Sequence, residues 1–149
     1  HPDDGLMKTT NLGDSGYIIF RREETGLTKV FRSKEQQYRF NFPYQCGTGC
    51  DLPHNAFDTE HQMIERDIVV MGTDGLFDNV FDDDMRPCLV KEKIEEPYTA
   101  AKCIGDLAYA KSHDKRYNSP FAVGAKQAGK YYQGGKKDDI TVIVAEVMK

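Results

Sequence analysis

Long apolar runs are missing from this sequence, and none approaches the roughly 20 residues that a membrane-spanning helix needs. No secretory leader is evident at the start, His1-Pro2-Asp3-Asp4. That start has no initiator Met and no capping pattern, and it runs straight into a strand-like segment, which points to a cleaved or truncated chain. We therefore expect an intracellular protein, cytoplasmic or organellar, with no membrane partner.

Positive charge is also scarce. Lys and Arg number 20 against 24 Asp and Glu, which gives a net charge of −4. Proteins that bind nucleic acid through bulk charge are basic, so we expect no nucleic-acid partner. An acidic site would itself need bound cations before it could accept a phosphorylated substrate.

Cysteines are few, and only four occur. Cys88 and Cys103 lie in amphipathic, helix-like stretches, where Cys usually behaves as a small buried apolar residue. Cys46 and Cys50 could clip a metal, but no second Cys or His pair stands at zinc spacing. We expect reduced thiols in a reducing compartment, with disulfides or a zinc clip as the alternatives.

What the sequence does contain is a set of β-rich segments. Residues 15–22 (SGYIIFRR) and 27–32 (LTKVFR) predict a hairpin, and 38–42 (YRFNF) alternates like a half-buried strand. The continuous apolar run 67–73 (DIVVMGT) predicts a strand buried on both faces. Residues 140–147 (ITVIVAEV) predict a second central strand.

Helical patterns lie between the last two strands. Asp82, Asp83 and Asp84 are typical of an N-cap and acidic first turn, in a stretch that carries Met85, Leu89 and Ile94. Pro97 is expected to open a second helix. Residues 43–66 and 113–137 look irregular. Strands, two helices and a final strand predict an α+β layered fold within a single domain.

Acidic residues stand at the ends of the predicted strands. Asp14 precedes one strand, Asp74 directly follows another, and Asp78 comes four residues later. Asp138 and Asp139 immediately precede the last strand. Bringing several carboxylates together is costly unless a cation neutralises them. Oxygen ligands suit Mg²⁺ or Mn²⁺, so the pattern favours a divalent metal site.

Other interpretations stay open at this level. Asp-Gly pairs also form ordinary turns at strand ends. Gly13-Asp14-Ser15-Gly16 superficially resembles a serine-nucleophile motif, although the four histidines fall in terminal or loop segments. The Asp82–Asp84 run could belong to a calcium-binding module, but it lacks the alternating ligands and closing Glu of a calcium loop.

Three strings together resemble signature blocks of the type 2C metal-dependent protein phosphatases. They are residues 11–16 (NLGDSG), 72–79 (GTDGLFDN) and 138–144 (DDITVIV), in the family's order and at compatible separations. Finer detail is similar to the subgroup found in mitochondria and plastids. It includes Ser15-Gly16 in place of Ser-Arg, Glu35-Gln36-Gln37, Phe42-Pro43-Tyr44-Gln45, Ser119-Pro120-Phe121 and Gly134-Gly135-Lys136.

The resemblance implies a fold and a place within it. The family packs two mainly antiparallel sheets face to face between helices, an α-β-β-α sandwich. Residues 1–149 would form the C-terminal portion of a single phosphatase catalytic domain, with the sandwich incomplete.

The resemblance also implies an activity. The family hydrolyses phosphoserine and phosphothreonine in phosphoprotein substrates through a water activated by two Mg²⁺ or Mn²⁺ ions. Asp74 and Asp138 would be ligands of that centre, and Asp14 and Asp78 would join Asp74 around an additional, weaker metal. Asp139 stands where many members have Asn, so we expect it to support the site. The alternative is a phosphatase-like binding or regulatory module without catalysis.

Part of the family's pattern is absent. The chain has no Glu-Asp pair, no Asp-Gly-His-Gly metal block and no matching phosphate-binding Arg. We therefore expect these 149 residues alone to bind metal weakly and to hydrolyse phosphoesters poorly or not at all. Exposed sheet edges and an apolar face would favour a homodimer. The irregular stretches 43–66 and 113–137 are candidate substrate-facing loops.

Overall fold

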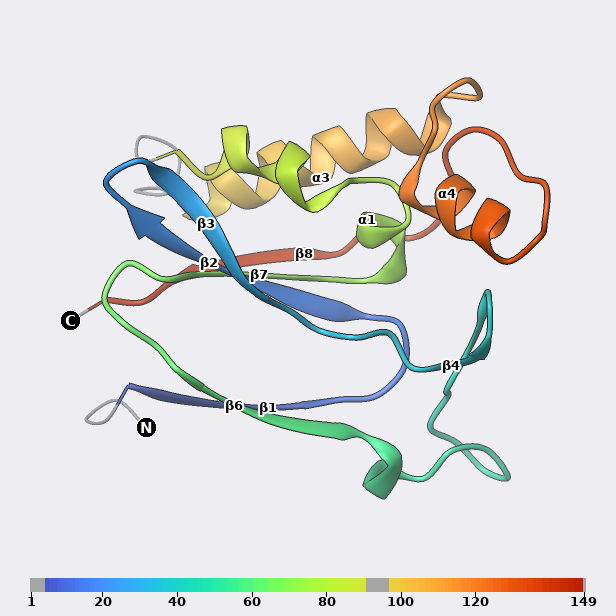
Figure 1. Cartoon of the computed structure of the whole chain (residues 1–149), viewed down its shortest axis with the longest axis horizontal. Helices are drawn as coiled ribbons and strands as arrows, with labels where there is room; N and C mark the ends of the chain where they lie inside the picture. The colour runs from blue at the N-terminus through green and yellow to red at the C-terminus, as the bar shows by residue number, and fades with distance from the viewer. Residues whose placement is uncertain (1–4, 91–96, 149) are drawn as a thin grey trace.

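Two stacked antiparallel sheets, a separate two-stranded hairpin and a layer of helices make up the computed structural model, which describes residues 5–90 and 97–148. The larger sheet has the order β3-β2-β7-β8, and the smaller pairs β1 with β6. Figure 1 shows the long helix α3 (Pro97–His113) above the larger sheet and the smaller sheet below it. The strands are β1 (Leu6–Asn11), β2 (Gly16–Glu23), β3 (Gly26–Arg32), β6 (Phe57–Gln62), β7 (Ile68–Gly72) and β8 (Val142–Glu146).

Strand β2 lies at the centre of both layers of the core. Ile18 and Phe20 face the helices, while Tyr17 and Ile19 face the smaller sheet. All four side chains are buried. Because successive side chains of a strand point to opposite faces, a strand covered on both sides needs an unbroken apolar run.

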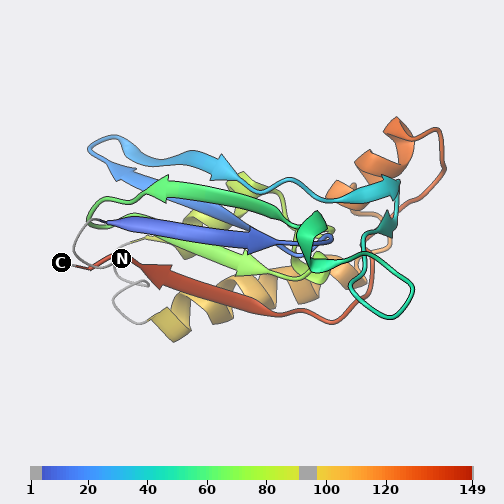
Figure 2. The ribbon, with the colours of Figure 1, turned by 90° about the horizontal axis from the view of Figure 1, so that it is seen from below.

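Helix α3 (Pro97–His113) is the main cover of the larger sheet, and Figure 2 shows it on the side opposite β1 and β6. Ala100, Ile104 and Ala108 are fully buried against the sheet. The shorter helices are η1 (Pro53–Asn55), α1 (Asp74–Phe77), η2 (Asp82–Cys88) and α4 (Pro120–Gln127). Within residues 5–90 and 97–148, no helix has the length and apolar character needed to cross a membrane.

The expected α+β class is confirmed, as are the hairpin of β2 with β3, the strand β7 and the start of α3 at Pro97. Of the four layers expected, the described part of the chain shows three. No α-helix of that part covers the outer face of β1 and β6 (Figures 1 and 2).

Several local predictions are wrong. Residues 38–42 form a hairpin of β4 (Gln37–Arg39) and β5 (Phe42–Pro43), not one strand, because Asn41 adopts a left-handed turn with φ 57°. Strand β8 lies at the edge of its sheet and not at the centre. Met71 of β7 is 45% exposed, so that strand is not buried on both faces throughout.

The stretches expected to be irregular contain three further elements, η1, β6 and α4. The Asp82–Asp84 run does lie in a helical first turn, but the element is the 3₁₀-helix η2 and its N-cap is Phe81. Ile94, expected in the same helix, lies outside the described residues.

The expected reduced state of Cys88 and Cys103 is also wrong, because the two form a disulfide. The packing of η2 against α3 brings their Cα atoms to 5.6 Å, within the range that a disulfide requires. Cys46 and Cys50 are free and exposed.

Candidate metal centre

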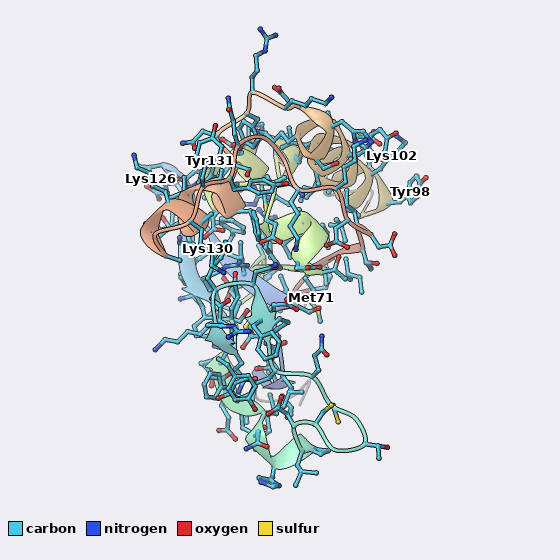
Figure 3. The ribbon with its side chains drawn as sticks, turned by 90° about the vertical axis from the view of Figure 1, so that its right-hand side faces the viewer. Met71, Tyr98, Lys102, Lys126, Lys130 and Tyr131 are labelled. Atoms are coloured by element: carbon cyan, nitrogen blue, oxygen red, sulfur yellow. A yellow bond between two sulfur atoms is a disulfide. The ribbon has the colours of Figure 1, made fainter. Side chains whose placement is uncertain are left out.

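Three of the four predicted acidic residues converge on one positive charge. The ammonium of Lys136 lies 3.0 Å from Asp74, 2.6 Å from Asp78 and 3.2 Å from Asp138. Asp74 is the first residue of α1 and Asp78 is its C-cap, shortly after β7, while Asp138 comes from the segment before β8. Figure 3 looks onto this end of the molecule, where α1 lies near α4. The fold therefore brings together residues that stand about 60 positions apart in the chain.

Threonine 73 joins the two segments that carry these acids. Its hydroxyl donates to the backbone carbonyl of Asp139 at 2.9 Å and accepts from the backbone N–H of Thr141 at 3.1 Å. Gly75 lets the same segments approach, because a Cβ there would lie 2.3 Å from the Asp139 carbonyl oxygen. Thr73 and Gly75 thus have a packing role, in addition to the metal-binding role expected for Asp74 between them.

Asn79 holds Lys136 in place. Its side chain is fully buried, and its amide donates to the carbonyls of Gly75 at 2.9 Å and Lys136 at 2.7 Å. Its side-chain oxygen accepts the backbone N–H of Lys136 at 2.8 Å. The contact with Gly75 anchors this buried amide to α1, and the two contacts with Lys136 fix α1 against the segment that leads to Asp138.

The close packing of these acids and Lys136 shifts their pKa values. Burial raises the pKa of Asp78 to about 6, although hydrogen bonding to Lys136 works in the opposite direction. Burial also opposes the charge on Lys136, but Asp78 and Asp74 outweigh it and raise its pKa. Partial burial opposes ionisation of Asp138, yet the backbone N–H of Asp139 and the Lys136 ammonium bring its pKa below the usual range.

Asp14 lies at the margin of the cluster. Burial and the nearby charge of Asp74 raise the pKa of Asp14, and Lys136 lowers it. Glu35 is a further acid near the site, since the charges of Asp14, Asp74 and Lys136 all influence its pKa, which burial raises. The structure thus places Asp14 within electrostatic reach of the centre but not on the Lys136 ammonium.

Sequence reasoning missed Lys136, Asn79 and Glu35 as members of the site. All three lie inside the sequence strings on which the family resemblance rests. Those strings alone do not indicate which side chains these residues contact. The available signal was physical: an acidic cluster requires a cation, and Lys136 stands two residues before Asp138.

The donor set suits a divalent metal. Carboxylate oxygens from separate segments already surround a cation, and such oxygens are the preferred ligands of Mg²⁺ and Mn²⁺. In the described part of the chain, no three His, Cys, Asp or Glu side chains form a ready-made metal site. The acids surround an ammonium instead.

The Asp82–Asp84 run, considered above as a calcium module, has different partners. Asp82 pairs with Lys29 and Arg32, Asp83 with Arg86, and Asp84 with Lys111. No two of these carboxylates share a cation among the described ion pairs, an arrangement that favours a structural role for the run.

Known proteins resemble the chain over nearly its whole length. No protein-family model matches it. It is 41% identical over 146 residues to "Probable protein phosphatase 2C 55" of Arabidopsis thaliana, covering 95% of this chain and 30% of that protein. It is 36% identical over 160 residues to "Protein phosphatase PTC7 homolog fig" of Drosophila melanogaster, covering 99% of this chain and 50% of that protein.

Solved structures of phosphatases also resemble the chain. The photosystem II phosphatase PBCP superposes with a TM-score of 0.82 at 29% identity, covering 97% of this chain and 60% of PBCP. The Mycobacterium tuberculosis serine/threonine phosphatase PstP/Ppp shares the fold, with a TM-score of 0.64 at 16% identity over 97% of this chain and 56% of that one. A PstP catalytic domain with a TM-score of 0.59 and 16% identity, covering 97% of this chain and 55% of that one, was solved with 2 manganese ions. The chain spans only 30–50% of the curated relatives named above.

Proposed function

This chain belongs to the protein phosphatase 2C family, and on that basis we propose that it is part of a metal-dependent protein serine/threonine phosphatase. The substrates would be phosphoserine and phosphothreonine side chains of phosphoproteins. One observation carries the proposal: Asp74, Asp78 and Asp138 meet within 3.2 Å of a single positive charge. A binding module without catalysis would have no need to keep this costly cluster of carboxylates.

Each acid has a proposed task. Asp74 and Asp138 would hold the Mg²⁺ or Mn²⁺ of the catalytic centre, and Asp14 and Asp78 would join Asp74 around an additional, weaker metal. When bound, the metals supply an activated water and neutralise charge on the phosphoryl oxygens. Thr73, Gly75 and Asn79 keep the acid-bearing segments in register, so that the ligands need little rearrangement.

The relatives are longer than this chain, so a complete catalytic domain would need residues beyond these 149. We propose that further residues supply the remaining ligands, a phosphate-binding Arg and the second helical layer of an α-β-β-α sandwich. Residues 1–149 would thus be the C-terminal portion of one catalytic domain, inside the cell in the cytoplasm or an organelle. Residues 43–66 and 113–137 would face the substrate.

The test uses the full-length protein with p-nitrophenyl phosphate and a phosphothreonine peptide in the presence of Mn²⁺. Asp74→Asn removes charge from a ligand, so we expect kcat/KM to fall by about 10²-fold or more. Asp106→Asn is the matched control, because Asp106 is an exposed acid on α3 paired only with Lys102 among the contacts described, and activity should stay unchanged.

Two results would contradict the proposal. Full-length protein that binds phosphopeptide but never hydrolyses it would indicate the non-catalytic alternative. Mn²⁺-dependent turnover that survives Asp74→Asn would remove Asp74 from the centre. The 149-residue chain alone should show little or no turnover in the same assay.

A further inference from the structure

Lys136 is not placed like an ordinary surface lysine. Its side chain is 19% exposed, and its ammonium contacts three carboxylates that come from two segments of the chain. It also lies 5.0 Å from the centre of the Phe121 ring, which α4 supplies. The charged end therefore lies inside the cluster, enclosed by acids and an aromatic ring.

The backbone of Lys136 is fixed as firmly as its side chain. Asn79 binds both its N–H and its carbonyl. The preceding residue, Gly135, lies so close to the end of α3 that a Cβ would come within 2.1 Å of the Lys111 carbonyl oxygen. The backbone of this lysine thus has little freedom to move, so the ammonium can leave the acids only by rotation of its flexible side chain.

A metal ion and this ammonium would use the same oxygen atoms. Three carboxylates close together repel one another unless a cation lies between them. One ammonium supplies that cation, but a divalent ion bound to the same oxygens would lie beside a like charge in a partly buried place. The two cations should therefore exclude each other from the carboxylates.

We propose that Lys136 is the internal counter-ion of the metal centre: it holds Asp74, Asp78 and Asp138 together in the metal-free chain and leaves them when Mg²⁺ or Mn²⁺ binds. The inference rests on the proposed metal site and adds a regulator of its affinity. The lysine keeps the ligands assembled and, by competing for them, makes metal binding weaker than the acids alone would allow.

The test compares Lys136→Met with Lys137→Met in the 149-residue chain. Lys137 is the exposed neighbouring lysine, so its substitution removes the same formal charge one residue away. Free Mn²⁺ is measured by electron paramagnetic resonance, and melting temperature is measured in EDTA and in Mn²⁺. We expect Lys136→Met to bind Mn²⁺ about tenfold more tightly or better. It should also melt lower than the wild type in EDTA and gain more from Mn²⁺.

Three outcomes would overturn the proposal. They are unchanged or weaker Mn²⁺ binding by Lys136→Met, the same gain in Lys137→Met, and no Mn²⁺ binding by any of the chains. A measurement on the wild type covers the case in which Lys136→Met does not fold. The ¹⁵N signal of the Lys136 ammonium should shift or disappear as Mg²⁺ is added, and a signal unchanged in saturating Mg²⁺ would also refute the exchange.

The outcome is separable from that of the phosphatase test. Asp74→Asn can abolish phosphatase activity whether or not Lys136 competes with metal. Conversely, Lys136 can exchange with Mn²⁺ in a chain that hydrolyses nothing.

Discussion

At the scale of single residues, Gly75 shows how closely the two halves of the site approach. A Cβ at this position would lie 2.3 Å from the Asp139 carbonyl oxygen and 3.2 Å from a side-chain carbon of Ile140. Both neighbours belong to the segment that carries Asp138. An added methyl group must therefore push that segment away from α1.

We predict that Gly75→Ala lowers the free energy of unfolding by about 2 kcal/mol through this overpacking. Gly105→Ala is the matched control, because Gly105 lies within α3 and a Cβ there would meet nothing within 4 Å. That variant should gain about 0.5–1 kcal/mol from improved helix propensity. Urea unfolding followed by circular dichroism measures both, and equal stability of the two variants would contradict the packing argument.

The positions of acidic residues at the ends of apolar strands allow the acids of the site to be predicted from the sequence. The lysine that neutralises these acids cannot be predicted in the same way. Asp74, Asp78 and Asp138 stand beside apolar strands, and the structure brings them together as the pattern predicts. Their metal-binding roles stay predictions. Lys136 was missed because a lysine after two glycines looks like an exposed turn residue, and the contacts that fix its backbone come from Asn79, 57 residues earlier in the chain.

At the scale of elements, the link between η2 and α3 is covalent. The disulfide of Cys88 with Cys103 joins residues 15 positions apart. Each element buries apolar side chains in the core above the larger sheet, Met85 from η2 and Ile104 from α3. The sequence left a disulfide only as an alternative, because the separation of two cysteines in a sequence does not reveal how the elements that carry them pack.

We predict that reducing this disulfide lowers the free energy of unfolding by about 3 kcal/mol, as expected for a closed loop of about 15 residues. The measurement is thermal unfolding with and without dithiothreitol in a Cys46→Ser, Cys50→Ser background, which leaves one cysteine pair. Adding Cys103→Ala to that background gives the control, whose melting temperature should not respond to reductant. An equal melting temperature of the parent with and without reductant would refute the prediction.

The missed elements had two different causes. Strand β6 has mostly exposed side chains and no apolar run, so it exists through its pairing with β1, a partner about 50 residues away that the sequence does not identify. Helix α4 did carry a local signal. Ser119 is an N-cap whose hydroxyl accepts the N–H of Ala122, and Pro120 occupies the first turn, a start signature that was readable.

At the scale of the whole molecule, the space between the two sheets is incompletely closed. A cleft of about 450 Å³ lies between β1 and the β7–β8 side of the larger sheet, and Met7, Val69 and Ile143 are among its lining residues. On the same side Met71 is 45% and Ile143 53% exposed. β8 is an edge strand, and exposed edges favour pairing with another chain.

We therefore predict that the 149-residue chain self-associates through β8 and this apolar face. Analytical ultracentrifugation over a range of concentrations should show a homodimer in equilibrium with monomer.

Ile143→Lys combined with Met71→Lys should shift the equilibrium to monomer, because each lysine would lie unpaired in the contact. Leu52→Lys is the control, since Leu52 is equally exposed at 53% but lies in the loop before η1, away from β8. A chain that stays monomeric at every concentration, or a dimer that both sets of substitutions weaken alike, would contradict this interface. Because only residues 139–141 separate Asp138 from the start of β8, a dimer formed here would lie near the candidate metal centre, so the same substitutions reveal whether association alters Mn²⁺ binding.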